Sequence, residues 1–492
     1  MKESIIVIGS GFSSISAASY LAQKGYKVKI FEKNNTLGGR ARQLKKDGFT
    51  FDMGPSWYWM PDVFERYFND FGKKQNDYYK LNRLDPAYDV YFGKRDKITI
   101  DGNLENIYKT YENFEKGSAL KLKKFINEAK SNYDIAIKDL VYRPGKSPLE
   151  LITAKTITKL DYFIRNIRQD VYKEFKNDKL RQLLQFPVLF LGAKPEKTPA
   201  FYNFMNFADY GLGTWHPEGG MYSIIKAMVN LAKSLGVKFE INSPVEKIIV
   251  KNRKVVGVKI NNTLNKADII LSGADYHHTE KLLESNYRAY SENYWSKKTF
   301  APSSLLFYIG IDKKLRNISH HSLFFDVSFD RHASEIYDTP KWPENPLFYT
   351  NFPSISDKSM APKNKEACTI LIPLAPGLND NNSTREKYFN LVINRLEQIT
   401  EQNIIKHILF KESFCVNDFV SQYNSYKGNA YGLANTLFQT AFLRPKLKSK
   451  KVDGLFFTGQ LTVPGPGVPP ALISGKISAG LVEKHLRKPS RQ

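Results

Sequence analysis

Cysteine is almost absent from this chain. Only Cys368 and Cys415 occur among 492 residues, which excludes the disulfide framework that holds many small secreted domains together. No Cys-x-x-Cys pair and no Cys/His cluster is present, so we expect no metal site. Two adjacent histidine pairs occur at 277–278 and 320–321. Neighbouring residues of a strand point to opposite faces, which makes such pairs poor joint metal ligands.

Long hydrophobic runs are missing as well. No stretch of about 20 uninterrupted apolar residues, the length that a bilayer-spanning helix needs, is present. The apolar run at 5–8 follows Met1 after only three residues and leads directly into a glycine turn. It is too short for a secretory signal peptide. We therefore expect a cytoplasmic protein, associated peripherally with the inner face of the membrane.

Acidic residues are scarce relative to basic ones. The chain has 73 Lys and Arg against 49 Asp and Glu, a net charge of +24. Such a charge suits nucleic acid or an anionic membrane, or reflects a lysine-rich proteome. No nucleic-acid-binding motif is recognisable, so we expect no nucleic-acid partner. A hydrophobic content of 42% excludes a disordered chain, and the length allows about three domains or two enlarged ones.

The N-terminal segment predicts a dinucleotide-binding unit. Residues 5–8 form the β-branched run of a buried parallel strand, and the turn GSGFSS (9–14) leads into a helical pattern. Gly9 permits the tight turn, and Gly11 lets the backbone approach a diphosphate at the helix N-terminus. Glu32 follows a second strand and is placed to accept hydrogen bonds from the ribose hydroxyls.

The next segment favours FAD over a nicotinamide cofactor. Residues 37–42 read LGGRAR, and flavoproteins of the amine oxidase and carotenoid desaturase superfamily carry a similar stretch just after the ribose-binding acid. The glycines permit close approach, and Arg40 supplies a guanidinium fork for phosphate oxygens. The alternative is a surface loop with a solvated arginine.

A second glycine-rich turn lies near the C-terminus. Residues 452–459 predict a buried strand, which leads through PGPGVPP (464–470) into a helix expected over 471–482. The N-terminus of a helix stabilises the negative charge that a reduced flavin carries near N1 and O2. A loop that only closes the sheet is the alternative.

Taken together, these motifs resemble those of the bacterial-type phytoene desaturases, within the carotenoid/retinoid oxidoreductase family. The resemblance covers most of the chain. It includes FDMGPSWYWMP (51–61), WHPEGGMYSIIKAM (215–228) and the tail GLFFTGQLTVPGPGVPPALISGKISAGL (454–481), which is its most specific part. Ser14 replaces the third fingerprint glycine, and the tail reads GPGVPP; neither departure removes a charged or catalytic side chain.

The resemblance implies a discontinuous α/β architecture. A Rossmann-like FAD-binding domain of the amine oxidase/desaturase superfamily would carry an inserted α+β substrate domain. We expect residues 1–61, 216–282 and 426–492 in the FAD-binding domain. Residues 62–215 and 283–425 would form the substrate-binding, membrane-facing domain.

The resemblance also implies where FAD binds, with the backbone of Val245 at the adenine. It identifies no catalytic residue and no metal ligand. The positions that we expect to contact FAD are Gly9, Gly11, Phe12, Ser13, Glu32, Gly38, Gly39, Arg40, Gly54, Pro55, Ser56, Val245, Gly459, Gly467 and Val468.

The activity that the resemblance implies is FAD-dependent desaturation of phytoene in successive steps toward lycopene, with hydride transfer to flavin N5. A membrane surface would supply this long apolar polyene, and a quinone or oxygen would accept the electrons. One alternative is desaturation of another carotenoid, either hydroxylated or a C30 precursor. An amine or porphyrinogen oxidase is a second, and a non-enzymatic prenyl-binding protein of the Rab escort or dissociation-inhibitor type is a third.

Two further patterns concern the substrate. Apolar residues recur at helical spacing from Ile157 through Ile164 to Val171, with lysines and arginines between them. This predicts one basic amphipathic helix, which lies in a membrane interface or covers a core. Aromatic residues gather near the flavin motifs and line an apolar tunnel or belong to the core; they are Trp57, Tyr58, Trp59, Tyr202, Phe204, Phe207, Tyr210 and Trp215.

Overall fold

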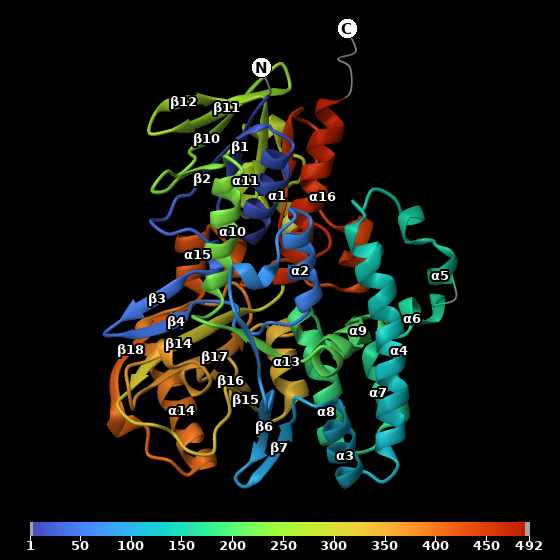
Figure 1. The fold of residues 1–492 in the computed structure, drawn as a ribbon, viewed down its shortest axis with the longest axis vertical. Helices are drawn as coiled ribbons and strands as arrows, with labels where there is room; N and C mark the ends of the chain where they lie inside the picture. The colour runs from blue at the N-terminus through green and yellow to red at the C-terminus, as the bar shows by residue number, and fades with distance from the viewer. Residues whose placement is uncertain (1–2, 158, 488–492) are drawn as a thin grey trace.

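The computed structural model describes residues 3–157 and 159–487. Figure 1 shows an upper body of helices and strands at the end where both termini lie. Below it, a large sheet lies on one side and a group of helices on the other.

A five-stranded parallel sheet forms the centre of the upper body, in the order β19-β13-β1-β2-β9. Apolar residues fill its central strands and are buried on both faces, as parallel strands covered on two sides require. The predicted α/β fold is confirmed. The strands are β1 (Ser4–Ile8), β2 (Lys27–Phe31), β9 (Lys238–Glu240), β13 (Ile269–Ser272) and β19 (Leu455–Phe457).

Helices α1 (Phe12–Gln23), α10 (Tyr222–Ser234) and α16 (Val468–Leu486) pack on this sheet. α1 and α16 approach closely because Gly475 has no side chain: a Cβ there would lie 2.5 Å from the carbonyl oxygen of Ser13. The Ser16 hydroxyl donates to the Leu472 carbonyl at 2.8 Å. The N-terminal turns of α1 and α16 thus pack together and join the two ends of the chain.

The lower sheet has seven strands in the order β18-β14-β17-β16-β15-β6-β7. It is antiparallel except where β15 pairs with β6. Helix α14 (Asn382–Thr400) covers one face with an apolar stripe. The strands are β6 (Tyr88–Gly93), β7 (Asp96–Ile100), β14 (Ser303–Ile311), β15 (His321–Phe324), β16 (Phe348–Asn351), β17 (Glu366–Leu374) and β18 (Ile408–Phe414).

Smaller elements complete the two bodies. A three-stranded antiparallel sheet lies at the edge of the upper body. Its strands are β10 (Lys247–Lys251), β11 (Lys254–Ile260) and β12 (Thr263–Lys266). Two two-stranded sheets are β3 (Gln43–Lys46) with β4 (Phe49–Asp52) and β5 (Leu81–Arg83) with β8 (Trp215–Pro217). The remaining helices outside the helical group are α2 (Pro61–Asn69), α11 (Tyr276–Lys281), α12 (Glu292–Ser296), α13 (Phe329–Tyr337) and α15 (Val416–Tyr423).

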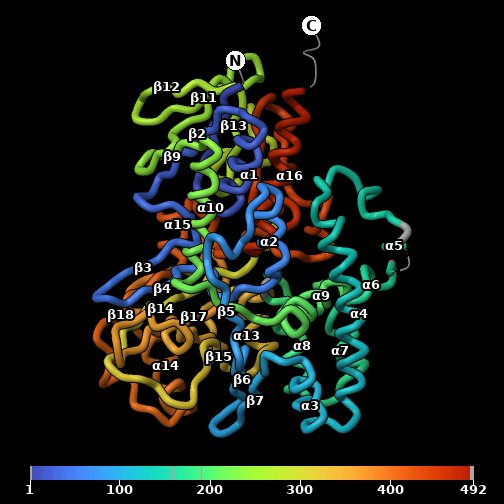
Figure 2. Tube along the Cα trace, viewed as in Figure 1, coloured from blue at the N-terminus to red at the C-terminus, as the bar shows by residue number. Residues whose placement is uncertain are grey.

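The helical group consists of α3 (Leu104–Phe114), α4 (Ser118–Lys138), α5 (Ala154–Ile157), α6 (Leu160–Ile164), α7 (Ile167–Glu174), α8 (Asp178–Gln185) and α9 (Phe204–Asn206). Figure 2 shows α5 and α6 along the outer edge of the molecule. No helix within the described residues combines the length and the apolarity needed to cross a membrane.

The prediction of one amphipathic helix through Ile157, Ile164 and Val171 is wrong, because the segment forms α5, α6 and α7. Asn166 has an extended backbone and caps α7 through a capping box with Gln169, which ends the preceding helix. The apolar residues consequently face in different directions. Val171 is fully buried, whereas Ile164 is 81% exposed.

Candidate functional site

A cavity of about 1090 Å³ lies at the carboxyl edge of the parallel sheet. The loops that follow β1, β2, β13 and β19 all line it. Ligands of open α/β sheets bind outside these strand ends. The cavity also extends between the helical group and the lower sheet. Its volume lies just above the roughly 300–1,000 Å³ of an ordinary small-molecule site.

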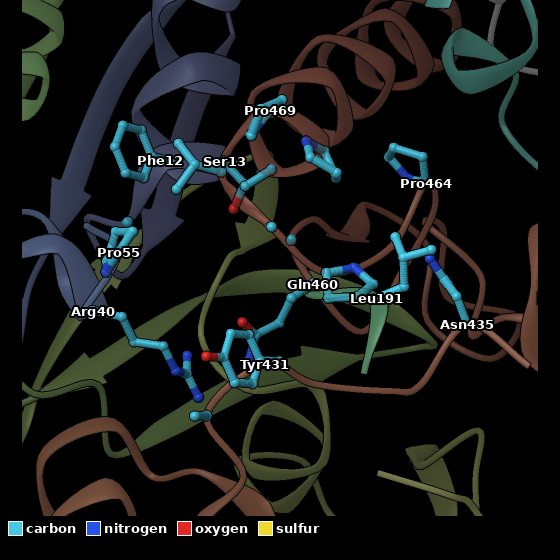
Figure 3. A pocket seen from close by; sticks show the side chains of 18 of the residues that line it. Phe12, Ser13, Arg40, Pro55, Leu191, Tyr431, Asn435, Gln460, Pro464 and Pro469 are labelled. Atoms are coloured by element: carbon cyan, nitrogen blue, oxygen red, sulfur yellow. The ribbon is translucent and has the colours of Figure 1, made fainter. Parts of the chain in front are cut away.

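All fifteen residues that we expect to contact FAD line this cavity. Figure 3 shows Phe12 and Ser13 at the start of α1, close to Pro469 in the first turn of α16. Tyr431 and Gln460 lie across the space from them. The two glycine turns that the sequence places hundreds of residues apart therefore meet at one site.

The turn after β1 presents unused backbone donors to the cavity. Gly9 has φ +85° and donates to the Phe31 carbonyl at 2.8 Å, which holds the start of the turn beside the end of the parallel strand β2. Gly11 is the N-cap of α1 and offers no side-chain cap, and a Cβ on it would meet nothing within 4 Å. Gly467 caps α16 in the same way. The first turn of α1 thus leaves N–H groups for a negatively charged ligand. In α16 only Val468 among the first three residues carries an N–H, because Pro469 and Pro470 have none.

Glu32 is fixed with its carboxylate at the cavity. Its Oε2 accepts from the Ser10 amide at 3.0 Å and from the Ser10 hydroxyl at 2.6 Å. Its Oε1 accepts from the Asn34 amide at 2.9 Å. Since a carboxylate offers about four acceptor positions, this arrangement orients Glu32 and still leaves capacity for a ligand hydroxyl.

Arg40 is held inside the protein. Its Nη2 donates to the Ser425 hydroxyl at 3.1 Å and to the Asn429 carbonyl at 3.3 Å. With the Gln460 amide oriented so that its oxygen faces Arg40, that oxygen accepts at 3.1 Å. The Nε atom is buried and has no partner among the described residues. The alternative of a solvated surface arginine is wrong.

Arg40 and Asp275 carry opposite charges and are both buried, and they interact without direct contact. Burial raises the pKa of the Asp275 carboxyl, and the Arg40 guanidinium opposes that rise. Burial likewise lowers the pKa of Arg40, with Asp275 opposing. The Tyr423 hydroxyl beside Arg40 is buried without a described partner. Open space at Gly11, two uncapped helix starts and an unmet guanidinium donor fit the diphosphate and flavin of FAD.

The other end of the cavity is apolar. Its one imidazole, His332, accepts from the Leu347 amide at 3.0 Å and donates to the Pro373 carbonyl at 2.9 Å. Burial lowers the pKa of His332 to about 4, so the ring is neutral. The wall formed by α9, α13 and the lower sheet carries no carboxylate among its described residues, although Glu150 lines the cavity in the segment before Ile152. The apolar residues at this end are Phe186, Leu189, Leu191, Phe201, Phe204, Met205, Leu323, Phe325, Phe329, Ala333, Ile336, Leu347, Phe348 and Leu371.

The aromatic residues that the sequence singles out divide between the cavity and the core. Trp57, Trp59, Tyr202 and Phe204 line the cavity. The other four belong to the packed interior: Tyr58, Phe207, Tyr210 and Trp215.

The histidine pairs are engaged singly. The Nε2 atom of His277 lies 2.9 Å from Glu292, and that of His278 lies 3.0 Å from Asn424. His321 is on β15, with its Nδ1 atom 2.6 Å from the Tyr349 hydroxyl. In the described part of the chain no three His, Cys, Asp or Glu side chains gather as a metal would require.

Sequence reasoning missed several cavity residues. Tyr431, Asn435 and Gln460 line it but were not predicted as site residues. Tyr431 and Asn435 lie in no motif, whereas Gln460 lies in the C-terminal tail motif, directly after Gly459. One face of α13 lines it as well, and its spacing of three and four residues from Phe329 to Tyr337 was a detectable signal.

Comparisons with known proteins agree with this site. The family model of the flavin containing amine oxidoreductases matches residues 13–482. The chain belongs to this family. It is 38% identical over 481 residues to the carotenoid 3,4-desaturase of Haloarcula japonica, covering 97% of each chain. It is 34% identical over 492 residues to the 4,4'-diapophytoene desaturase (4,4'-diaponeurosporene-forming) of Staphylococcus haemolyticus, covering 96% of this chain and 97% of that one.

A solved structure shares the fold. An oxidoreductase from Methanosarcina mazei matches with a TM-score of 0.63 and 16% identity, covering 98% of this chain and 100% of that one. Membership of the family makes FAD the cofactor and the protein an FAD-dependent oxidoreductase.

Proposed function

We propose that this protein desaturates a carotenoid. Two hydrogens leave neighbouring carbons of an allylic C–C bond, one as a hydride and one as a proton, and a double bond remains. Bound FAD supplies the oxidant for the hydride. The observation that carries the proposal is that one cavity runs from the glycine turns to an apolar wall formed by α9, α13 and the lower sheet, which carries no carboxylate among its described residues. Two relatives that cover nearly the whole chain are named as carotenoid desaturases.

We assign the predicted cofactor residues to parts of FAD by the elements that carry them. The turn at Gly9 and Gly11 and the start of α1 would hold the diphosphate, and Glu32 the ribose. Val245 would contact the adenine. Arg40 and the start of α16 would face the flavin. The supporting observation is that all these residues line the cavity.

The division into domains follows the same assignment. Residues 1–61, 216–282 and 426–492 would form the FAD-binding domain, and these segments contain all five strands of the parallel sheet. Residues 62–215 and 283–425 would form the substrate domain.

The apolar end would position a polyene and exclude water. A hydrocarbon offers no hydrogen bond, so the shape of the lining must determine which bond lies at the flavin. An amine substrate is disfavoured, because an ammonium group would be buried there without a carboxylate. A prenyl-binding protein without catalysis would not need an FAD site.

The substrate within the carotenoids is open between two candidates. Phytoene, desaturated stepwise toward lycopene, is the first. A different carotenoid is the second, and the names of both relatives favour it. A quinone or oxygen would reoxidise the cofactor.

A membrane surface would deliver the substrate. Near one opening of the cavity, Ile152, Ile157 and Phe438 line it and are at least half exposed. Apolar side chains at a cavity mouth suit contact with lipid.

Pigment analysis tests the proposal. The chain is expressed in three hosts, which accumulate phytoene, 4,4'-diapophytoene or a hydroxylated carotenoid. We expect longer-wavelength absorption in the extract of one host, because each new conjugated double bond extends the polyene. Unchanged pigment in all three hosts, with FAD-loaded protein present, would contradict carotenoid desaturation.

A further inference from the structure

A second, smaller cavity of about 310 Å³ is lined mainly by basic residues. Four lysines contribute to it: Lys146, Lys446, Lys448 and Lys484. They come from three parts of the chain, namely the segment after α4, the segment before β19 and the last turn of α16. Folding therefore brings these charges together from distant positions.

This basic pocket shares walls with the large cavity. The Lys446 ammonium donates to the Gly145 carbonyl at 2.8 Å and to the Phe442 carbonyl at 2.6 Å. Gly145 and Phe442 both line the large cavity, while the neighbouring Lys146 lines the pocket. The segment with Gly145 and Lys146 and the segment with Phe442 and Lys446 therefore each line both the large cavity and the basic pocket.

The pocket carries a net positive charge. Asp453 accepts from Lys448 at 3.3 Å and lies 3.5 Å from His485. Burial, together with the nearby Lys450, lowers the pKa of Lys446, and Glu150 opposes this. Lys146 and Lys484 are exposed. The lysines thus outnumber the carboxylates that face them, which suits a phosphate anion.

Exposed apolar residues occur in two of the segments that carry the pocket lysines. Leu149 is 71% exposed and Phe438 is 78% exposed. Leu149 lies three residues from Lys146, and Phe438 belongs to the segment that leads to Lys446. Apolar side chains beside a basic cluster are typical of surfaces that dock on anionic lipid.

We propose that the basic pocket binds the phosphate group of an anionic phospholipid in a bilayer and holds the cavity mouth against the membrane. The proposal builds on the proposed function, which explains why an opening would face lipid. Vesicle binding is measured without any carotenoid, so its outcome does not depend on whether the protein desaturates one.

The test compares two triple variants with the same charge change. Lys146→Gln/Lys448→Gln/Lys484→Gln alters the pocket and keeps Lys446, which ties Gly145 to Phe442. Lys363→Gln/Lys387→Gln/Lys406→Gln alters exposed lysines on α14, just after α14 and just before β17; Figure 1 shows α14 on the opposite side of the molecule from α5 and α6. Binding is measured by flotation with phosphatidylcholine vesicles, with and without phosphatidylglycerol.

We expect wild type to bind vesicles that contain phosphatidylglycerol and to bind pure phosphatidylcholine weakly. At about fivefold per lysine, the pocket variant should lose about 100-fold in affinity, and the control variant less than about threefold. Equal losses in both variants would show attraction by overall charge and overturn the site. No loss in the pocket variant would also overturn it. Thermal unfolding and FAD content, compared with wild type, show that each variant is folded.

Inorganic phosphate at matched ionic strength distinguishes a lipid site from a site for the free ion. If phosphate raises the melting temperature of wild type but not of the pocket variant, while both bind vesicles equally, the pocket takes the free ion and the lipid proposal is wrong. Weaker vesicle binding of the pocket variant in the absence of phosphate supports it.

Discussion

The two ends of the large cavity are built by different means. At the FAD end, backbone N–H groups of α1, the glycine turn before α16 and a few fixed polar groups such as Glu32 face the space. At the other end, apolar side chains from the helical group, α13 and the lower sheet form the wall. Backbone recognition needs particular residues at particular positions, whereas an apolar wall accepts many residues of similar volume. The first end is therefore visible in a sequence, and the second is not.

The largest expected effect concerns a buried acid that supports the apolar end. Asp209 accepts from the Tyr88 hydroxyl at 2.7 Å and contacts Thr214, which accepts from the cavity residue Trp59 at 2.8 Å. Burial raises the pKa of Asp209 to about 8 from an ordinary 3.8. The folded protein thus retains a proton that the unfolded chain releases. As the pH rises from the ordinary pKa of 3.8 toward the raised pKa of about 8, the free energy of unfolding should fall by about 1.4 kcal/mol per pH unit.

Asp209→Asn should remove this contribution, because the amide does not titrate. Urea unfolding of wild type and variant from pH 5 to pH 8 measures the difference. Parallel pH profiles would mean that Asp209 does not titrate as the structure indicates.

Gly11→Val tests the FAD end alone. A side chain there enters open space that we assign to the diphosphate, so the fold should persist while the Kd for FAD rises about 10- to 100-fold, or about 1–3 kcal/mol. Gly480→Val is the matched control, since a Cβ at Gly480 also meets nothing within 4 Å but lies on α16 away from the cavity lining. Fluorescence titration with FAD measures both. Equal Kd values for Gly11→Val and wild type would place the diphosphate elsewhere.

Ala333→Phe tests the apolar end. Ala333 lines the cavity from α13 and is buried, so a larger side chain should narrow the space for a polyene. We expect about tenfold less desaturated pigment at unchanged FAD content. Ala333→Ser keeps the size and should behave like wild type. If pigment formation persists in Ala333→Phe, the substrate does not pass α13.

The smallest expected effect is at the edge of the helical group. Ile164→Ser should change the free energy of unfolding by less than about 0.5 kcal/mol, because the Ile164 side chain is 81% exposed. Chemical denaturation measures it. A loss of about 2 kcal/mol or more would place Ile164 in a core, as a single helix through this segment requires.

The sequence predicted the parts of the site that depend on local geometry. Gly9, Gly11 and Glu32 lie within one strand–turn–helix–strand unit, so their spacing alone indicates their arrangement. The partners of Arg40 were not predictable in this way. Ser425 and Asn429 are nearly 400 residues away and meet Arg40 only through tertiary packing.

The segment that forms α5, α6 and α7 shows a different error: here a local signal in the sequence was overlooked. The spacing of Ile157, Ile164 and Val171 favours one helix, but Asn166 and Gln169 form a capping box that begins a new one. Asn followed three residues later by Gln is a recognisable start signal. The apolar wall carries a weaker signal, the helical spacing along α13, which does not distinguish a cavity lining from a core.

One measurement tests the central claim most directly, namely that a single flavin lies between two remote glycine turns beside an apolar channel and oxidises a polyene there. FAD-loaded protein is mixed anaerobically with each candidate carotenoid while the visible spectrum is recorded. We predict that one carotenoid bleaches the oxidised-flavin absorption and gains one conjugated double bond for each flavin reduced. A flavin that stays oxidised with every carotenoid, although the carotenoid is bound, would contradict the account.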